Sequence, residues 1–146
     1  MPVSASRAAS ISDPVHVVMV KAPQGIEERL REAMEPLRKV QGFVSAAVTR
    51  RDGLVIHHTF PSARAAAGLS AMAAAMVGAS RAAGAELGIG LPTYGFIYFE
   101  DGILLIQDAG PQAILACLLE LGANIGYVIT RISRISDQVR EALEDL

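Results

Sequence analysis

The chain has 146 residues, a formal net charge of −2 and a single cysteine. This length favours one domain that buries enough surface to fold without a disulfide or a structural metal. Aromatic residues make up 5% of the chain and no basic stripe is present, which argues against nucleic-acid binding. The sequence shows neither a transmembrane span nor a convincing signal peptide, so we expect a cytoplasmic protein.

The first 23 residues differ from the rest of the chain. Residues 1–14 are small and polar, which is typical of a flexible tail. The run VHVVMV, residues 15–20, is a candidate edge strand. We therefore divide the chain into a flexible N-terminal extension, residues 1–23, and a domain over residues 24–146.

A first helix is predicted over residues 24–39, where apolar residues recur at helical spacing and charges fill the other positions. Pro36 is expected to kink or end it. Two hairpins are predicted farther on, because β-rich runs flank Asp52-Gly53 and Asp101-Gly102.

The remaining segments are a long alanine-rich helix, an ambiguous apolar run and a last helix. Ser62 is a plausible N-cap for the alanine-rich helix, which extends to about Leu87. Residues 111–122, PQAILACLLELG, fit either a buried strand or a short helix. From Asn124 onward the 3.6-residue period predicts a helix. The order indicates an α+β fold with a mostly antiparallel sheet.

The alanine-rich helix has two unusual faces. One carries bulkier residues and is expected to pack on the sheet: Leu69, Met72, Met76, Ala83 and Leu87. The other carries only small residues where a surface helix places charges: Ala67, Ala71, Ala74, Gly78, Ala82 and Ala85. Such a smooth face allows a second helix to approach closely. A helix made of alanine for its propensity alone is the simpler alternative, but interior glycines weaken a helix.

The strand expected over residues 94–99 also indicates contact with a second chain. Tyr94, Phe96 and Tyr98 point to one side, whereas Gly95, Ile97 and Phe99 point to the other. Because both sides are apolar, the strand should be covered on both faces, and at a sheet edge it would need another chain to pair with. A twofold dimer would satisfy both the strand and the small helix face.

These features resemble the Roadblock / dynein-light-chain family from about Ile26 to Leu143. The resemblance is carried by VQGFVSAAVTRRDGLVI, the alanine-rich helix, GILLIQDAG and AILACLLELGANIGYVITRI. It implies an α-β-β-α-β-β-β-α order with a five-stranded sheet, so residues 113–121 become the fifth strand. The N-terminal extension and Pro36 depart from the minimal family pattern.

The resemblance also implies a homodimer in which the third strands pair and the second helices lie side by side. Prokaryotic members of the family look like regulators of Ras-like small GTPases, some as GTPase-activating proteins and others as scaffolds. In the bacterial polarity-control members the second-helix face receives one GTPase, no arginine is inserted, and the GTPase's own switch region is reshaped. The expected function is therefore a homodimeric, non-catalytic regulator or scaffold that binds a Ras-like GTPase and modulates GTP hydrolysis. A structural scaffold without effect on GTP turnover and a small-molecule sensor are the alternatives.

No residue is assigned a catalytic, cofactor-binding or metal role. His57 and His58 are strand neighbours that point to opposite faces and cannot chelate one metal as a pair. Cys117 lies in an apolar run and is expected to be a core residue. GIGLPTYG lacks the Gly-Lys-Ser/Thr ending of a phosphate loop. Arg64 and Arg81 flank the small face and are candidates for steering a GTPase; for a catalytic arginine finger, a solvated helix flank is the preferred interpretation.

Overall fold

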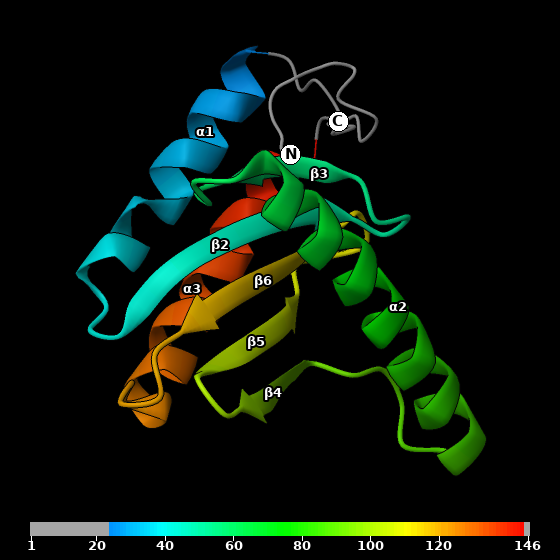
Figure 1. Ribbon diagram of the computed structural model, residues 1–146. Helices are drawn as coiled ribbons and strands as arrows, with labels where there is room; N and C mark the ends of the chain where they lie inside the picture. The colour runs from blue at the N-terminus through cyan, green and yellow to red at the C-terminus, as the bar shows by residue number, and fades with distance from the viewer. Residues whose placement is uncertain (1–23, 145–146) are drawn as a thin grey trace.

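The structure, a computed structural model, describes residues 24–144 (Figure 1). The predictions for the tail, for the strand at 15–20 and for its His16 lie outside these residues. The elements are α1 (Gln24–Met34), the 3-10 helix η1 (Glu35–Lys39), β2 (Phe43–Arg50), β3 (Val55–His58), α2 (Ala63–Leu87), β4 (Tyr94–Phe99), β5 (Gly102–Asp108), β6 (Ala113–Leu119) and α3 (Ile125–Ala142). The predicted order is confirmed, and the ambiguous run is strand β6.

The strands form one five-stranded sheet in the order β3-β2-β6-β5-β4. Every neighbouring pair is antiparallel. The first hairpin therefore places β3 at one edge of the sheet, and the second hairpin places β4 at the other edge. Within the described residues, no helix is long and apolar enough to cross a bilayer.

The sheet is covered on both faces, which gives three layers (Figure 1). On one face, α1 and α3 enclose the larger core, where Leu30 and Ile132 pack with Leu105, Leu115 and Cys117 of the central strands. On the other face, Ala73 and Val77 of α2 pack on β5 and β6. Because β5 and β6 are buried on both faces, their sequences read as continuous apolar runs rather than as an alternating pattern.

The helix ends follow local rules. Pro36 stands in the first turn of η1, where the chain leaves α1 and tightens into a 3-10 helix, so the predicted interruption is confirmed. The Ser62 side chain accepts a hydrogen bond from the Ala65 N–H at 3.1 Å, as predicted for an N-cap. Gly88 ends α2 in the left-handed conformation, with φ of 69°. Asn124 caps α3 through the Tyr127 N–H.

Candidate protein-interaction surface

The second helix lies on the sheet through a narrow strip of small residues. Ala66, Ser70, Ala73 and Val77 are buried. The expectation that Leu69, Met72, Met76, Ala83 and Leu87 form the packing stripe is wrong for part of that set. Leu69 and Met76 are half-buried and Ala83 is exposed, whereas Met72 is 60% and Leu87 68% exposed. Small residues in the strip bring the helix close to the sheet, and the bulkier side chains are left on its flank.

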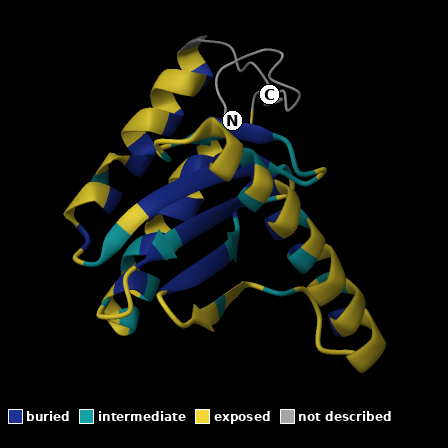
Figure 2. Ribbon diagram, in the orientation of Figure 1, coloured by how far each residue is buried: buried dark blue, intermediate teal, exposed yellow. Residues whose placement is uncertain are grey.

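The predicted small face divides into two parts. In the first half of α2, Ala71 and Ala74 lie against the chain's own β2–β3 turn: a Cβ added to Gly53 would lie 3.2 Å from the Ala71 Cα and 3.7 Å from the Ala74 Cβ. Ala67 and Ala74 are half-buried. In the second half, small side chains stay exposed where α2 runs out past the sheet (Figures 1 and 2), and these residues are Gly78, Ala82 and Ala85.

The exposed side of α2, here called the outer face, is almost free of polar groups. Between Arg64 and Glu86, which are both exposed near its two ends, the exposed residues other than Met72 and Ser80 are alanine or glycine: Ala65, Gly68, Ala71, Ala75, Gly78, Ala79, Ala82, Ala83 and Ala85. Exposed helix positions are ordinarily charged or polar. A surface of this composition is suited to close packing against another helix.

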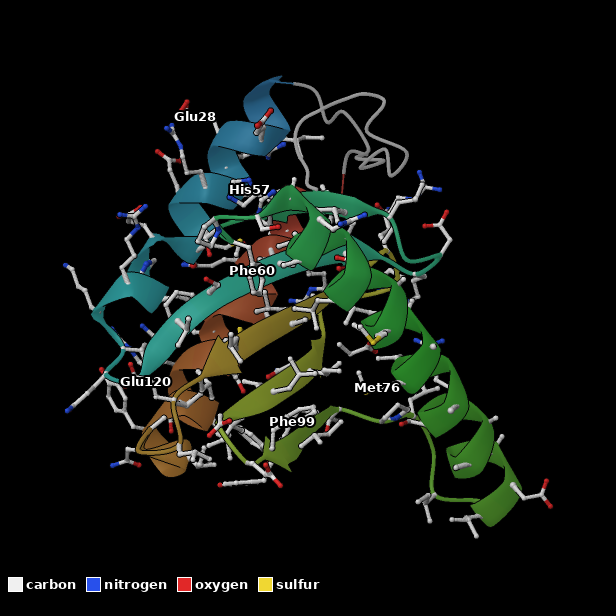
Figure 3. All side chains as sticks on the ribbon, in the orientation of Figure 1. Glu28, His57, Phe60, Met76, Phe99 and Glu120 are labelled. Atoms are coloured by element: carbon white, nitrogen blue, oxygen red, sulfur yellow. The ribbon has the colours of Figure 1, made fainter. Side chains whose placement is uncertain are left out.

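Strand β4 is an apolar edge strand that the described part of the chain leaves largely uncovered. Tyr98 is 62% and Phe99 55% exposed, and Tyr94 and Ile97 are also exposed. Phe96 is half-buried against the larger core and meets Tyr94 edge-to-face at 6.1 Å. The prediction that both faces of this strand are covered is therefore not met within residues 24–144. Figure 3 marks Phe99 at the exposed end of the strand.

The turn between α2 and β4 adds to this edge, and the sequence analysis did not assign it a role. Ile89 is 74% and Leu91 67% exposed, beside the exposed Leu87. We use the name β4 patch for these three residues together with Tyr94, Ile97, Tyr98 and Phe99. A groove of about 370 Å³ separates α2 from β4, with Met76, Ser80, Tyr94 and Ile97 among its lining residues. Three large apolar residues that alternate with glycines, Leu87 at the end of α2 and Ile89 and Leu91 in the turn, were the signal in the sequence that could have revealed this part.

The two candidate arginines lie in different surroundings. Arg64 is exposed in the first turn of α2. Arg81 lies farther along α2, and its Nη2 is 3.5 Å from Oδ2 of Asp108 at the end of β5. Asp108 is also paired with Arg51 from the β2–β3 turn. This cluster of three charged residues joins the turn, the helix and the sheet, and the sequence analysis missed it because its members are far apart in the chain.

The histidines and the cysteine have structural surroundings. His57 pairs with Val48 and His58 with Ala47, so their side chains point to opposite faces as predicted. Burial lowers the pKa of His57, and the charge of Glu27 opposes that shift. Cys117 is fully buried in the core, and burial raises the pKa of its thiol to about 12. No group of three or more His, Cys, Asp or Glu residues in the described part of the chain could hold a metal ion.

Comparisons with known proteins agree with the fold. The family model of the Roadblock/LC7 domain matches residues 30–119, which run from α1 to the end of β6. The chain belongs to the Roadblock/LC7 family. The Roadblock/LC7 match includes both candidate arginines and the whole β4 patch.

Solved structures of other proteins share this Roadblock/LC7 fold. The gliding protein MglB from Thermus thermophilus superposes with a TM-score of 0.78 at 22% identity, covering 88% of this chain and 98% of that one. An MglB described with a tetrameric arrangement superposes with a TM-score of 0.78 at 21% sequence identity, covering 88% of this chain and 97% of that one. A Roadblock/LC7 domain from Streptomyces avermitilis superposes with a TM-score of 0.72 at 21% sequence identity, covering 80% of this chain and 96% of that one. At sequence identities of 21–22%, this structural similarity shows that the proteins share a fold. A search of curated protein sequences found no match.

Proposed function

We propose that the protein is a homodimeric, non-catalytic regulator or scaffold in the cytoplasm that binds a Ras-like small GTPase and modulates its GTP hydrolysis. Membership of the Roadblock/LC7 family supports this class of function. The observation that carries the proposal is the exposure, in the single chain, of both the β4 patch and the outer face of α2. Contiguous apolar surface of this kind marks an interaction site.

The two edges of the sheet differ in a way that favours pairing through β4. Strand β3 has only four residues, ends in two histidines and breaks register with β2 between Val48 and Thr49. Short length and irregular pairing protect a sheet edge. Strand β4 has six residues in unbroken register with β5 and carries no charged side chain. An edge of this second kind pairs with another strand, and a second copy supplies an identical one.

The proposed interface joins this strand to the small face of α2. Pairing β4 with its copy places the projecting half of α2 beside its counterpart, and alanine and glycine let the two helices approach closely. An MglB with a tetrameric arrangement is consistent with self-association of this fold. The residues proposed for the dimer or partner interface are Ala67, Ala71, Ala74, Gly78, Ala82, Ala85, Tyr94, Phe96 and Tyr98, with the first-half alanines contributing beside the β2–β3 turn.

The proposed action on the GTPase is a shift between its conformations rather than chemistry. A regulator changes a two-state switch only if it binds one state more tightly than the other. Arg64 and Arg81 would steer the GTPase toward the helix face through long-range attraction. This role requires no catalytic group from the regulator itself.

Self-association is tested by the molecular mass in sedimentation equilibrium. The wild-type chain, 15.4 kDa, should sediment at twice that mass. Gly78→Glu places a carboxylate on the outer face of α2, where an added Cβ meets nothing in the single chain, so the variant should remain folded as a monomer. Ser133→Glu, at an exposed position of α3, is the matched control and should remain a dimer. A Gly78→Glu variant that stays fully dimeric and still binds the GTPase would contradict the proposed interface.

The regulatory role is tested by GTP turnover of the Ras-like GTPase encoded nearest this gene, with and without the protein. A changed rate supports a regulator. Binding without any change in rate supports the alternative, a scaffold subunit with no effect on GTP turnover. Failure to bind such a GTPase in either nucleotide state would overturn both versions of the proposal.

A further inference from the structure

Asp108 is shared unequally by two arginines. Arg51 donates to Asp108 and to the Gly110 carbonyl, and its Nε lies 3.2 Å from the Pro111 carbonyl oxygen. For Arg81 the described residues show one contact to Asp108, in which Nη2 lies 3.5 Å from Oδ2. Arg51 is thus fixed by several acceptors on the β5–β6 side, whereas Arg81 is held by one long ion pair.

The cluster of Arg51, Arg81 and Asp108 also contains hydrogen-bond donors that are unpaired in the described part of the chain. Arg51 Nη1 and Arg81 Nε are buried, and within the described residues neither has a hydrogen-bond partner. A buried donor without a partner costs free energy, which a new acceptor recovers. Two guanidinium groups and one carboxylate leave one positive charge in excess. The side chain of Arg81 is 37% exposed, against 24% for Arg51, so Arg81 is the more accessible cation.

The position of Arg81 connects this cluster to the proposed binding face. Gly78 and Ala85 lie three and four residues from Arg81, so they are its neighbours on the helix surface. Both are exposed. In the proposed dimer these two positions lie along the contact between the α2 helices, so an acidic side chain of a GTPase seated across that pair of helices lies within reach of the guanidinium of Arg81.

We propose that Arg81 is a releasable arm that exchanges Asp108 for a carboxylate of the bound GTPase. This inference rests on the proposed function. In the free protein Asp108 holds Arg81 loosely, and in the complex Arg81 turns to the partner while Arg51 remains on Asp108. Asp108 is then a positioning residue that competes with the GTPase for Arg81.

Equilibrium binding to the same GTPase tests the exchange through variants with opposite expected effects. Arg81→Gln should weaken binding about tenfold and flatten its dependence on ionic strength. The matched control Arg134→Gln, at an exposed position of α3 on the opposite face of the sheet, should change binding by less than about threefold. Asp108→Asn removes the competitor and should tighten binding about two- to fivefold. Arg51→Gln leaves Asp108 to Arg81 alone and should weaken binding. Wild-type affinity in Arg81→Gln, or weaker binding by a folded Asp108→Asn, would overturn the proposal.

A second measurement needs no GTPase, so it separates this inference from the proposed function. Double-mutant cycles on the melting temperature should give a coupling of about 4 °C or more between Asp108 and Arg51, and less than about 2 °C between Asp108 and Arg81. Equal couplings would show that Arg81 is firmly held and would refute the releasable arm. If the unequal couplings are found but the wild-type protein binds no GTPase, the proposed function fails and the exchange with a GTPase fails with it.

Discussion

Gly84 of α2 lies so close to Gly90 that a Cβ added to Gly84 would overlap the Gly90 carbonyl oxygen. The Ile89 N–H also donates to the Gly84 carbonyl at 3.0 Å. This close approach folds the turn after α2 back onto the helix. It thereby sets the position of Ile89 and Leu91, two of the most exposed members of the β4 patch.

Gly84→Ala should lower the free energy of unfolding by about 1–3 kcal/mol, because backbone atoms of the turn must move to admit the methyl group. Gly68→Ala is the matched control, since an added Cβ there meets nothing within 4 Å. The control should be neutral or stabilising by up to about 1 kcal/mol through helix propensity. Chemical denaturation of both variants checks the prediction, and equal stability of the two would contradict it.

A buried hydrogen bond joins α2 to strand β2 of the sheet. The Thr49 hydroxyl donates to the Ser70 Oγ at 2.6 Å, and both residues are fully buried. Ser70→Ala should cost about 1–3 kcal/mol of stability, because the Thr49 hydroxyl loses its acceptor. The double variant Thr49→Val/Ser70→Ala should recover part of that loss, since both polar partners are then absent. Losses that simply add in a double-mutant cycle would argue against the bond.

His57 should make the protein less stable at mildly acidic pH. Burial lowers its pKa in the folded chain below the usual value of 6.5. As the pH falls below about 6.5, the unfolded chain takes up a proton that the folded chain resists, so the free energy of unfolding decreases. Above that pH the imidazole is neutral in both states and the effect disappears. His57→Gln should therefore flatten the stability profile between about pH 7.5 and pH 5, as measured by denaturant titration at each pH. Parallel profiles for the two proteins would rule out this role of His57.

Cys117 should be chemically inert in the folded protein. Its thiol is fully buried and its pKa is raised to about 12, so almost no thiolate exists at neutral pH. A disulfide reagent such as DTNB should modify it only at the rate at which the chain unfolds, and one equivalent should react at once in denaturant. Rapid labelling under native conditions would contradict this assignment.

Much of the architecture could be predicted from the sequence because it depends on local rules. Asp-Gly pairs marked both hairpins, Pro36 marked the end of the first helix, and Ser62 and Asn124 marked the helix starts. The sequence also indicated that β4 is apolar on both sides and that one side of α2 is smooth. The ambiguous run at 111–122, which contains strand β6, could not be resolved by periodicity, since a strand buried on both faces shows no alternation.

Only the tertiary structure decided how α2 sits on the sheet and which charges meet. Hydrophobic periodicity predicts that the bulkiest side chains face the core, but here Ala66, Ala73 and Val77 form the contact and Met72 stays outside. The helix can lie close to the sheet only where its own side chains are small. Which positions of the helix meet the strands depends on how the two elements pack, and the helix sequence alone does not show that. Arg51, Arg81 and Asp108 come from three distant segments, so their cluster follows from the way the hairpin, the helix and the sheet pack together.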